Sequence, residues 1–433
     1  MVNPRRRRAV ILVGNPAHPY SRAIRLGRTL TTLGYDVEIA ATNQVDLPRE
    51  ERDGELVIRR YPPTGPFARD SATGQLPPAE RAAGRSRSMV ARIWRSRRAR
   101  IAGWIWWPLP VRGWLHTLER ELLPADLYHS CGTLPITAAL DAQARDRRAG
   151  RTSTVIFDVI DITFDSNNVF AIPRPILSLL ERRERGWARS SDAHTAVNDV
   201  FADRAASSWG LSRRPSVVPN YPEPWSPPAE PPDRIRAATG LPPSTRICMF
   251  WGRLGPYVGL DEAAEAVLQV PDTALVVLGF GRGWDKSIAR DADPRYAGRH
   301  FTLPAVHPDE LASWVASADV ALCTLPPLSY NQRHTIPNKF LEAMTGGTPM
   351  VLGPNLPIME ELLRREELGR VAPSMAPADI AAAIRSILDL PVEERMAWRE
   401  RIQTVARERY SWPIAAEEYV GLIRTLEARS PVG

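Results

Sequence analysis

The stretch AVILVGNPAHPYSRAIRLGRTLTTLGYDVEIA, residues 9–40, decides the fold class. Ala9–Val13 is a continuous apolar run, which is typical of a strand covered by helices on both faces. After a short turn, apolar residues recur at near-helical spacing through residues 21–33. Gly34 is placed to end that helix, and Asp36–Ala40 predicts a second strand. Strand, helix and strand in this order form the repeating unit of a doubly wound α/β domain.

The alternation continues along the chain and is interrupted once. The proline-rich run 221–232 excludes a helix or a central strand, so we interpret residues 221–235 as a stiff linker. Further strands are predicted at Thr154–Val159, His194–Val197, Ser216–Val218, Ile247–Phe250, Thr273–Leu278, Asp319–Cys323 and Pro349–Leu352. Further helices are predicted at Leu260–Leu268, Leu311–Ala316, Asn338–Met344, Ile380–Leu388 and Ile414–Leu426.

The pattern predicts an α/β protein of two Rossmann-like, doubly wound domains that face an interdomain cleft. The first is residues 1–220 with a closing C-terminal helix at 412–433, and the second is residues 236–411. Each is large enough to bury its own core. Clefts between such domains, and helix N-termini at the carboxyl ends of strands, are favoured sites for phosphate-bearing ligands.

Composition narrows the class of protein and its partners. The chain has 433 residues, a formal net charge of +7 and a pI of about 9.6, which favours an anionic partner. Only Lys286 and Lys339 are lysines among 56 basic residues, so each is a candidate for a task that needs a compact point charge. Three scattered cysteines predict a reducing, cytoplasmic setting without disulfides or zinc. No apolar run approaches a membrane span, and Ala9–Val13 is too short for a secretory signal.

A glycine and an arginine end one of the predicted strands. Gly252 allows the backbone to pass close to a ligand, and Arg253 follows it at the mouth of the strand. A guanidinium there can bind a pyrophosphate through two hydrogen bonds. The alternative is an ordinary surface arginine.

A second motif lies in residues 330–351, where a polar loop ends at Pro337 and a helix is expected from Asn338. Lys339 falls in the first turn, where the helix dipole disfavours a cation unless an anion binds at the same end. Glu342 is on the same face of that helix. The pair suits a phosphate beside a sugar diol; the alternative is a surface ion pair three residues apart.

A third motif is Gly279-Phe-Gly281-Arg-Gly283 after a predicted strand. It approaches a dinucleotide fingerprint but has Trp284 at the last glycine position, and we expect no helix directly after it. A single nucleotide over a glycine turn fits better. A dinucleotide oxidoreductase or epimerase stays as an alternative class, although neither lysine follows a tyrosine by four residues.

Taken in order, these motifs and the segment Ser317–Leu322 resemble the donor domain of glycosyltransferase family 4, whose members are retaining enzymes of the GT-B fold. The N-terminal half, with Asp126-Leu-Tyr-His129 and Val217-Val-Pro-Asn-Tyr-Pro222, is similar to the acceptor domain of that family. The resemblance covers nearly the whole chain. It implies transfer of a sugar from a nucleoside-diphosphate sugar to an acceptor hydroxyl, with the leaving phosphate assisting the incoming hydroxyl and no metal required.

The resemblance also assigns roles to residues. It implies a diphosphate held by Arg253, a ribose bound by Glu342 and a catalytic His129. Two positions depart from the family pattern: Val258 replaces its usual lysine and His334 replaces a glutamate. We therefore predict that Lys339 supplies the missing cation; a catalytically silent subunit of the same fold is the alternative. The full set predicted to bind donor is Gly14, Gly252, Gly279, Gly281, Val306, His334, Asn338 and Glu342.

The segment Arg81–Trp114 is rich in arginine and tryptophan and has no acidic residue. Such a composition suits an anionic membrane surface, so we predict a lipid-linked or membrane-associated glycan as acceptor and peripheral binding to the inner face of the membrane. The residues predicted for this role are Arg97, Arg98, Trp104, Trp106 and Trp107. A packed lid, a nucleic-acid partner and a small-molecule natural product as acceptor are the alternatives.

Overall fold

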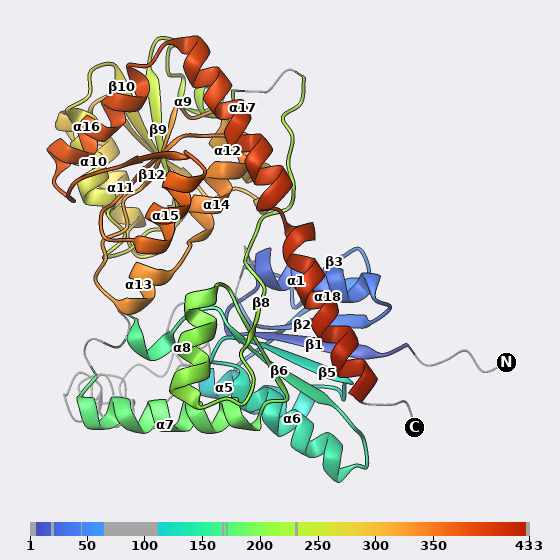
Figure 1. Ribbon diagram of the computed structural model, residues 1–433. Coiled ribbons are helices and arrows are strands. Elements are labelled where there is room, and N and C mark those ends of the chain that lie inside the picture. Colours follow the sequence, from blue (N-terminus) through green and yellow to red (C-terminus); the bar gives the residue numbers. More distant parts are fainter. Residues whose placement is uncertain are drawn as a thin grey trace, which may run out of the picture. The chain divides into compact units, whose positions relative to one another are not determined.

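The computed structural model describes residues 6–18, 21–44, 46–64, 111–166, 169, 172–229 and 233–429. Contacts divide the chain into two compact units, Met1–Pro219 with Ala416–Gly433 (unit 1) and Asn220–Ala415 (unit 2). The sequence placed these divisions after residues 220 and 411. Both units are α/β and Rossmann-like, as predicted (Figure 1).

Unit 1 is built on one sheet with the strand order β3-β4-β2-β1-β5-β6-β7-β8. All neighbours run parallel except β3 and β4, which are antiparallel at one edge. The strands are β1 (Arg8–Val13), β2 (Asp36–Thr42), β3 (Glu50–Asp53), β4 (Leu56–Tyr61), β5 (Leu127–Cys131), β6 (Thr154–Val159), β7 (Ala193–Ala196) and β8 (Ser216–Val217).

The helices of unit 1 pack on both faces of this sheet. α1 contacts β1, β2 and β4, whereas α6 packs against α5 and α7, and α7 against α8. The bounds are α1 (Ser21–Thr32), α5 (Arg112–Glu121), α6 (Ile136–Arg148), the 3-10 helix η2 (Thr163–Asp165), α7 (Arg174–Ser190), α8 (Asp199–Trp209) and α18 (Trp412–Arg429). α18 begins in unit 2 and continues into unit 1, which takes its residues from Ala416 onward.

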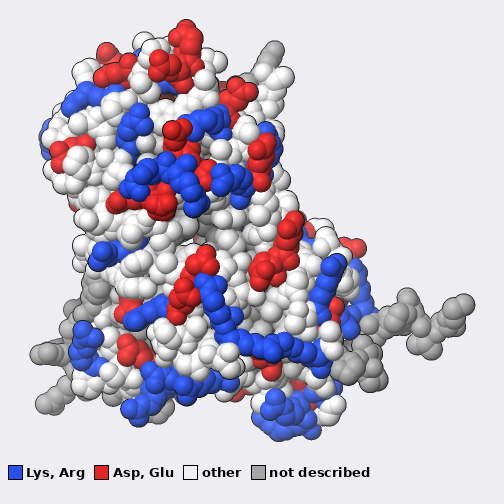
Figure 2. Space-filling model, in the orientation of Figure 1, with Lys and Arg blue, Asp and Glu red and all other residues white. Residues whose placement is uncertain are grey.

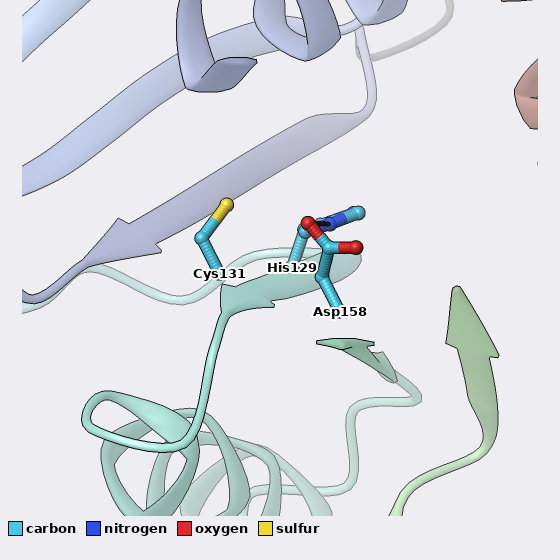
Figure 3. A group of neighbouring side chains, drawn as sticks. All are labelled: His129, Cys131 and Asp158. Carbon is cyan, nitrogen blue, oxygen red and sulfur yellow. Dashed lines mark ion pairs between the residues drawn. The ribbon is translucent and has the colours of Figure 1, made fainter. Parts of the chain in front are cut away.

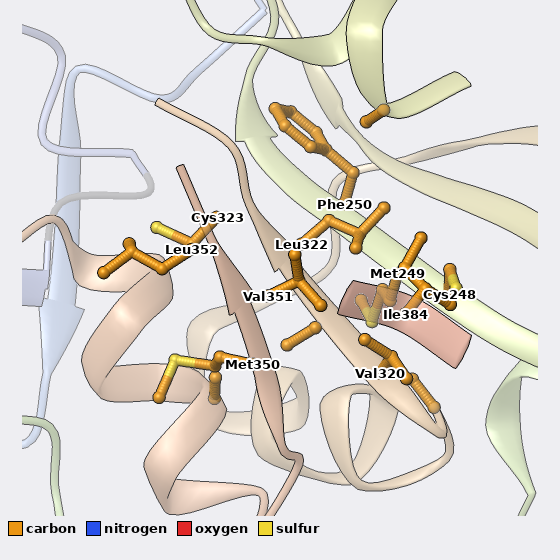
Figure 4. Close-up of a cluster of buried hydrophobic side chains, with 14 of the residues drawn as sticks. Cys248, Met249, Phe250, Val320, Leu322, Cys323, Met350, Val351, Leu352 and Ile384 are labelled. Carbon is orange, nitrogen blue, oxygen red and sulfur yellow. The ribbon is translucent and has the colours of Figure 1, made fainter. Parts of the chain in front are cut away.

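Unit 2 has a fully parallel sheet with the order β11-β10-β9-β12-β13-β14. The strands are β9 (Arg246–Arg253), β10 (Thr273–Phe280), β11 (His300–Pro304), β12 (Val320–Cys323), β13 (Met350–Leu352) and β14 (Gly369–Val371). Their apolar side chains form one continuous core, part of which is shown in Figure 4. Burial on both faces explains why these strands are unbroken apolar runs in the sequence.

Two helical layers cover this second sheet. α10 packs against α16, while α14 packs against α12 and α17. The bounds are α9 (Arg234–Thr239), α10 (Leu260–Leu268), α11 (Trp284–Asp291), the 3-10 helix η4 (Pro294–Tyr296), α12 (Pro308–Ala316), α13 (Tyr330–His334), α14 (Asn338–Thr345), α15 (Pro357–Arg365), α16 (Pro377–Leu388) and α17 (Val392–Arg409).

Two expectations about local structure were wrong. A helix, α11, does follow the glycine turn directly, starting at Trp284. Residues 330–334 form the short helix α13 instead of a polar loop; Ser329 caps it by accepting a hydrogen bond from the backbone of Gln332. Both helices are short and polar on one side, so their apolar periodicity is too brief to stand out.

Candidate active site

The strand order of unit 2 reverses at β9, which lies between β10 and β12. In open α/β sheets, ligands bind at such a switch point, beyond the carboxyl ends of the strands. Arg253 is the last residue of β9 and is exposed there. It takes part in no ion pair within the described part of the chain, so its guanidinium is available to an anion.

Glycines allow the loops beyond β9 and β10 to pack backbone against backbone. A Cβ on Gly279 would lie 2.5 Å from the carbonyl oxygen of Gly252, and a Cβ on Gly281 would lie 2.8 Å from that of Leu254. Gly281 has a φ of +107° and Gly252 a φ of +99°. A Cβ on Gly252 would meet open space instead, so its conformation, not crowding, requires glycine and its backbone is accessible to a ligand.

A third close approach fixes the start of α10 at the switch point. Gly259 has a φ of +78°, and a Cβ there would lie 1.6 Å from the carbonyl oxygen of Thr324, which follows β12. The Thr324 hydroxyl donates a hydrogen bond of 2.8 Å to the carbonyl of Gly259. Val258, which precedes Gly259, packs against the hydrophobic core.

Lys339 stands in the first turn of α14, as predicted. Its Nζ lies 3.6 Å from the centroid of the Phe250 ring in β9, a cation–π contact. Burial lowers the pKa of this ammonium, while Cys323 at the end of β12 and Glu342 act to raise it. The ammonium is therefore held at the junction of β9 and β12, the switch point itself; Phe250 and Cys323 are labelled in Figure 4.

Glu342 is oriented by β9 as well. The indole Nε1 of Trp251 donates a hydrogen bond of 2.7 Å to its Oε2. Neighbouring residues of one strand thus contact the two residues of α14 that the sequence singled out: Phe250 contacts Lys339, and Trp251 contacts Glu342. No local pattern predicts this pairing, because the two aromatics lie some ninety residues before α14 and indicate only a strand.

The other residues predicted to bind donor are more dispersed. His334 ends α13, where its Nδ1 lies 2.9 Å from the carbonyl oxygen of Tyr330 and its ring lies against the Tyr330 ring. Asn338, at the start of α14, accepts a hydrogen bond of 2.6 Å from Asn220. Val306 follows β11 and packs against the core. Gly14 belongs to unit 1, at the end of β1.

His129 lies inside unit 1, in the middle of β5, and is fully buried. Its Nδ1 is 3.0 Å from the hydroxyl of Tyr419 in α18, and its Nε2 is 3.6 Å from Asp158 in β6. The side chains of His129 and Asp158 face each other in Figure 3. These contacts join α18 to the sheet, and the catalytic role predicted for His129 stays a prediction.

Asp158 is the centre of this network. Arg22 donates to both of its carboxylate oxygens, at 2.7 and 2.8 Å, and the Thr195 hydroxyl donates at 2.7 Å. Burial by itself would raise the pKa of the Asp158 carboxyl, but the Arg22 guanidinium holds that pKa well below its usual range. The carboxylate is therefore charged and compensated inside the protein.

Within the described residues, His129, Cys131 and Asp158 form a group whose ligand atoms all lie within 4.8 Å of one another (Figure 3). That spacing admits a metal ion in principle. However, Arg22 and Thr195 already occupy the Asp158 oxygens, and the buried guanidinium charge opposes a cation. These residues do not fit a metal site, and we assign none to them.

The predicted membrane segment is only partly described. Arg97, Arg98, Trp104, Trp106 and Trp107 lie outside the described residues. Trp114, which belongs to the same tryptophan-rich run, is buried in α5 and donates a hydrogen bond of 2.9 Å to the carbonyl of Ala41. The ring of Trp114 is part of the core of unit 1 and is not available to a membrane surface.

Two features bear on large partners. Of the helices in the described ranges, none combines the length and the apolar composition of a membrane span. On the face drawn in Figure 2, arginines and lysines alternate with acidic side chains instead of forming one broad basic field. Ion pairs between exposed residues also occur in the described part of the chain, for example Arg214 with Asp199 and Asp203.

Comparison with known proteins places this geometry in context. Residues 245–389 match the profile of a family described as Glycosyl transferases group 1, and that stretch contains Arg253, Lys339 and Glu342. A 2-deoxystreptamine glucosyltransferase from Streptomyces kanamyceticus is 25% identical over 390 residues, covering 85% of this chain and 89% of the relative. A D-inositol 3-phosphate glycosyltransferase from Segniliparus rotundus is 30% identical over 203 residues, covering 45% and 42%.

Solved structures agree on the architecture. Sucrose-phosphate synthase from Thermosynechococcus elongatus superimposes with a TM-score of 0.69 at 15% identity, covering 98% of this chain and all of that one. Anabaena HepE, in complex with UDP and glucose, gives 0.63 at 13% identity, covering 97% and 100%. The chain has a GT-B glycosyltransferase fold. Together with the profile match, this supports a glycosyltransferase activity.

Proposed function

We propose that this protein is a retaining glycosyltransferase of the family 4 type, which moves a sugar from a nucleoside-diphosphate sugar to an acceptor hydroxyl. One observation carries the proposal: Lys339 and Glu342 are fixed by adjacent residues of β9 at the switch point of unit 2, beyond which Arg253 ends the same strand. An ammonium, a guanidinium and a carboxylate thus lie at the carboxyl ends of the strands. The two cations suit the diphosphate of a nucleoside diphosphate, and the carboxylate suits its ribose hydroxyls.

The leaving diphosphate is the part of the donor that gains charge as the sugar departs. Arg253 can bind phosphate oxygens through two hydrogen bonds, and Lys339 adds a compact charge at the N-terminus of α14, whose dipole also favours an anion. Preorganised positive groups of this kind act mainly on the transition state. Because Val258 is apolar and packs against the core, Lys339 is our candidate for the second cation.

Glu342 is our candidate for binding the ribose of the donor. Its Oε2 accepts a hydrogen bond from the Trp251 indole, which orients the carboxylate, and a carboxylate is a group that accepts hydrogen bonds from a diol. HepE structures that contain UDP and UDP-glucose share the fold and support a nucleotide-sugar donor for this chain too.

Retention of anomeric configuration and independence of metal are parts of the proposal that rest on the resemblance to family 4. In that scheme the departing phosphate takes the proton of the acceptor hydroxyl, and the protein supplies positioning and charge stabilisation. NMR of the fresh product distinguishes the two anomers. An inverted product would remove the retaining part, and loss of activity in EDTA that magnesium restores would remove the metal-free part.

Two acceptor classes follow. The arginine- and tryptophan-rich segment favours a lipid-linked glycan and peripheral membrane binding, whereas both curated relatives act, by their names, on small molecules, 2-deoxystreptamine and D-inositol 3-phosphate. Sedimentation with anionic and neutral vesicles at two salt concentrations separates them. Salt-sensitive binding to anionic vesicles alone supports the lipid-linked class, and no binding to either supports a small polyhydroxylated acceptor.

The decisive experiment on the function itself is donor turnover. Purified protein is incubated with a panel of nucleoside-diphosphate sugars, and release of the nucleoside diphosphate is measured with and without acceptor mixtures. We expect slow hydrolysis of one donor, abolished by Arg253→Ala. A folded protein that binds a donor but neither hydrolyses nor transfers it would instead support the catalytically silent subunit.

A further inference from the structure

A cavity of about 310 Å³ lies in unit 2, away from the candidate active site. Its lining includes Asp319, which directly precedes β12 and accepts a hydrogen bond from the backbone of Ile247 at the start of β9. The cavity therefore lies at the amino ends of the strands, whereas Arg253 lies at the carboxyl end of β9. At about 3.3 Å per strand residue, the amino and carboxyl ends of β9 are roughly 20 Å apart.

Three arginines and two aspartates supply the charges of the lining. Two of the arginines are well paired. Arg236 donates to Asp233 at 2.7 Å, and Arg399 donates to the carbonyls of Ala316 and Ala318 at 2.6 Å each, at the end of α12. These hydrogen bonds hold the two guanidinium groups as walls of the cavity.

Arg395 differs from both. Its closest acidic partner is Asp319 at 3.9 Å, the limit of an ion pair, and its Nε is buried without a hydrogen-bond partner. Burial lowers the pKa of this guanidinium, and the nearby positive charge of Arg246 lowers it further. A buried donor left without a partner is unfavourable, so an anion that accepts a hydrogen bond from Arg395 would be stabilised there.

Apart from Ser313 and Ser317, the rest of the lining is apolar. It includes Trp225 and Pro228 from the proline-rich segment, and Val392 and Met396 from the first turns of α17. Val392 is 53% exposed and Met396 is 65% exposed, so both present apolar surface that a ligand could cover. The volume is at the lower end of the range for small-molecule sites.

We propose that this cavity is a binding site, separate from the donor site, for a small anion that carries an apolar ring. The anionic group, a phosphate or a carboxylate, is held by Arg395, and the ring lies against Trp225 and Met396. The net positive charge selects the anion, and the exposed apolar wall selects the ring.

The experiment uses the full-length chain and titrates it with phenyl phosphate and with benzoate by calorimetry. Inorganic phosphate and benzyl alcohol test the anion and the ring separately. We expect one of the two ring-bearing anions to bind at least tenfold more tightly than either partial probe. The preferred anion tells phosphate from carboxylate, and absence of binding by both at millimolar concentration overturns the proposal.

Variants locate the site. Arg395→Met keeps the length of the side chain and removes its charge, so affinity should fall at least tenfold. Arg407→Ala, an exposed arginine of the same helix, and Lys339→Ala, at the donor site, should leave it within twofold. Unchanged affinity in Arg395→Met, or a loss confined to Lys339→Ala, would show that the probe binds elsewhere and refute the proposal.

A second variant that should increase affinity keeps the proposal testable if Arg395→Met does not fold. Asp319→Asn keeps an oxygen for the backbone of Ile247 but removes the negative charge that competes for Arg395. It should tighten binding severalfold. Weaker or unchanged binding in a folded Asp319→Asn protein contradicts the assignment of Arg395 as the anion ligand.

Discussion

At the scale of single residues, the choice of lysine over arginine is informative. This chain uses arginine for nearly every cation, yet Lys339 stands over the Phe250 ring at the switch point. An ammonium is a point charge that fits between two strand ends, whereas a guanidinium is a planar fork. The other lysine, Lys286, is exposed and pairs with Asp261 on the surface, so it provides a matched control.

We predict that Lys339→Ala lowers turnover by about 10²–10³-fold, the usual effect of removing one group that stabilises transition-state charge. Lys339→Arg should recover part of the activity, as should Val258→Lys in the Lys339→Ala background. Lys286→Ala should be close to the parent. The measurement is the turnover of all four variants with one verified donor. Near-parental activity of Lys339→Ala would contradict the prediction and would indicate that Arg253 and backbone amides bind the diphosphate without it.

The same residue predicts a pH dependence. Burial lowers the pKa of Lys339 below 10.5, so its proton, and the activity that needs it, is lost at a pH below the ordinary lysine value. The kcat/KM for donor should therefore decline on the alkaline side. Lys339→Arg stays charged, so its lower activity should lack that decline. An identical alkaline decline in Lys339→Arg would assign the titration to another group.

A second residue with an altered pKa lies in unit 1. Glu184 of α7 is buried and accepts hydrogen bonds from Thr133 at 2.7 Å and from the Trp209 indole at 3.3 Å. Burial raises the pKa of its carboxyl from 4.5 to about 7, although both hydrogen bonds act to lower it. The folded protein therefore keeps this proton at pH values where the unfolded chain has lost it.

From this we predict that Glu184→Gln changes the pH dependence of stability. Between about pH 4.5 and 7 the folded state binds more protons than the unfolded state, so the parent loses stability as pH rises through this window. The variant cannot ionise, and its advantage over the parent should grow by on the order of 3 kcal/mol from pH 4.5 to pH 8. Urea unfolding at both pH values measures this, with the exposed Glu417→Gln as control. A pH-independent difference would contradict it.

At the scale of elements, the first turn of α10 shows how a loop is fixed at the site. Gly259 combines a left-handed backbone with backbone contact to Thr324, so any side chain there displaces either α10 or the end of β12. Gly255, in the same loop, has open space around its Cβ position. The two glycines therefore differ both in backbone conformation and in what surrounds them, and only the structure shows these differences.

We predict that Gly259→Ala destabilises the protein by on the order of 3 kcal/mol or more, because strain and overlap add, and that it abolishes donor turnover. Gly255→Ala should change stability by less than about 1 kcal/mol. Thermal unfolding and donor hydrolysis of both variants provide the test. Equal stability of the two variants would show that the contact at Gly259 relaxes easily.

At the scale of the whole molecule, the chain divides into units that each contain a complete sheet. Arg253, Lys339 and Glu342 all belong to unit 2. The ends of this unit are joined to each other: Tyr221 packs edge-on against Tyr410, and the backbone N–H of Trp412 donates to the carbonyl of Pro222 at 2.7 Å. A fragment that begins at 236 and stops at 411 would lose both contacts.

We therefore predict that residues 220–415, expressed alone, bind a nucleoside diphosphate within about tenfold of the full chain, whereas the fragment 236–411 is less stable. Calorimetry with UDP and with other nucleoside diphosphates measures binding, and circular dichroism verifies folding. A folded fragment 220–415 that binds none of the diphosphates bound by the full chain would show that unit 1 supplies part of the nucleotide site.

The sequence by itself determined the two α/β units, most strand positions and the helices α10 and α14, because buried parallel strands and amphipathic helices leave local patterns. It also identified Arg253, Lys339 and Glu342 as candidates by their places at strand and helix ends. Only the tertiary structure showed that β9 aromatics hold Lys339 and Glu342, that Trp114 and His129 are buried, and that Arg395 lines a second cavity. These facts depend on contacts between residues far apart in the chain, and no local pattern records which side chain meets which.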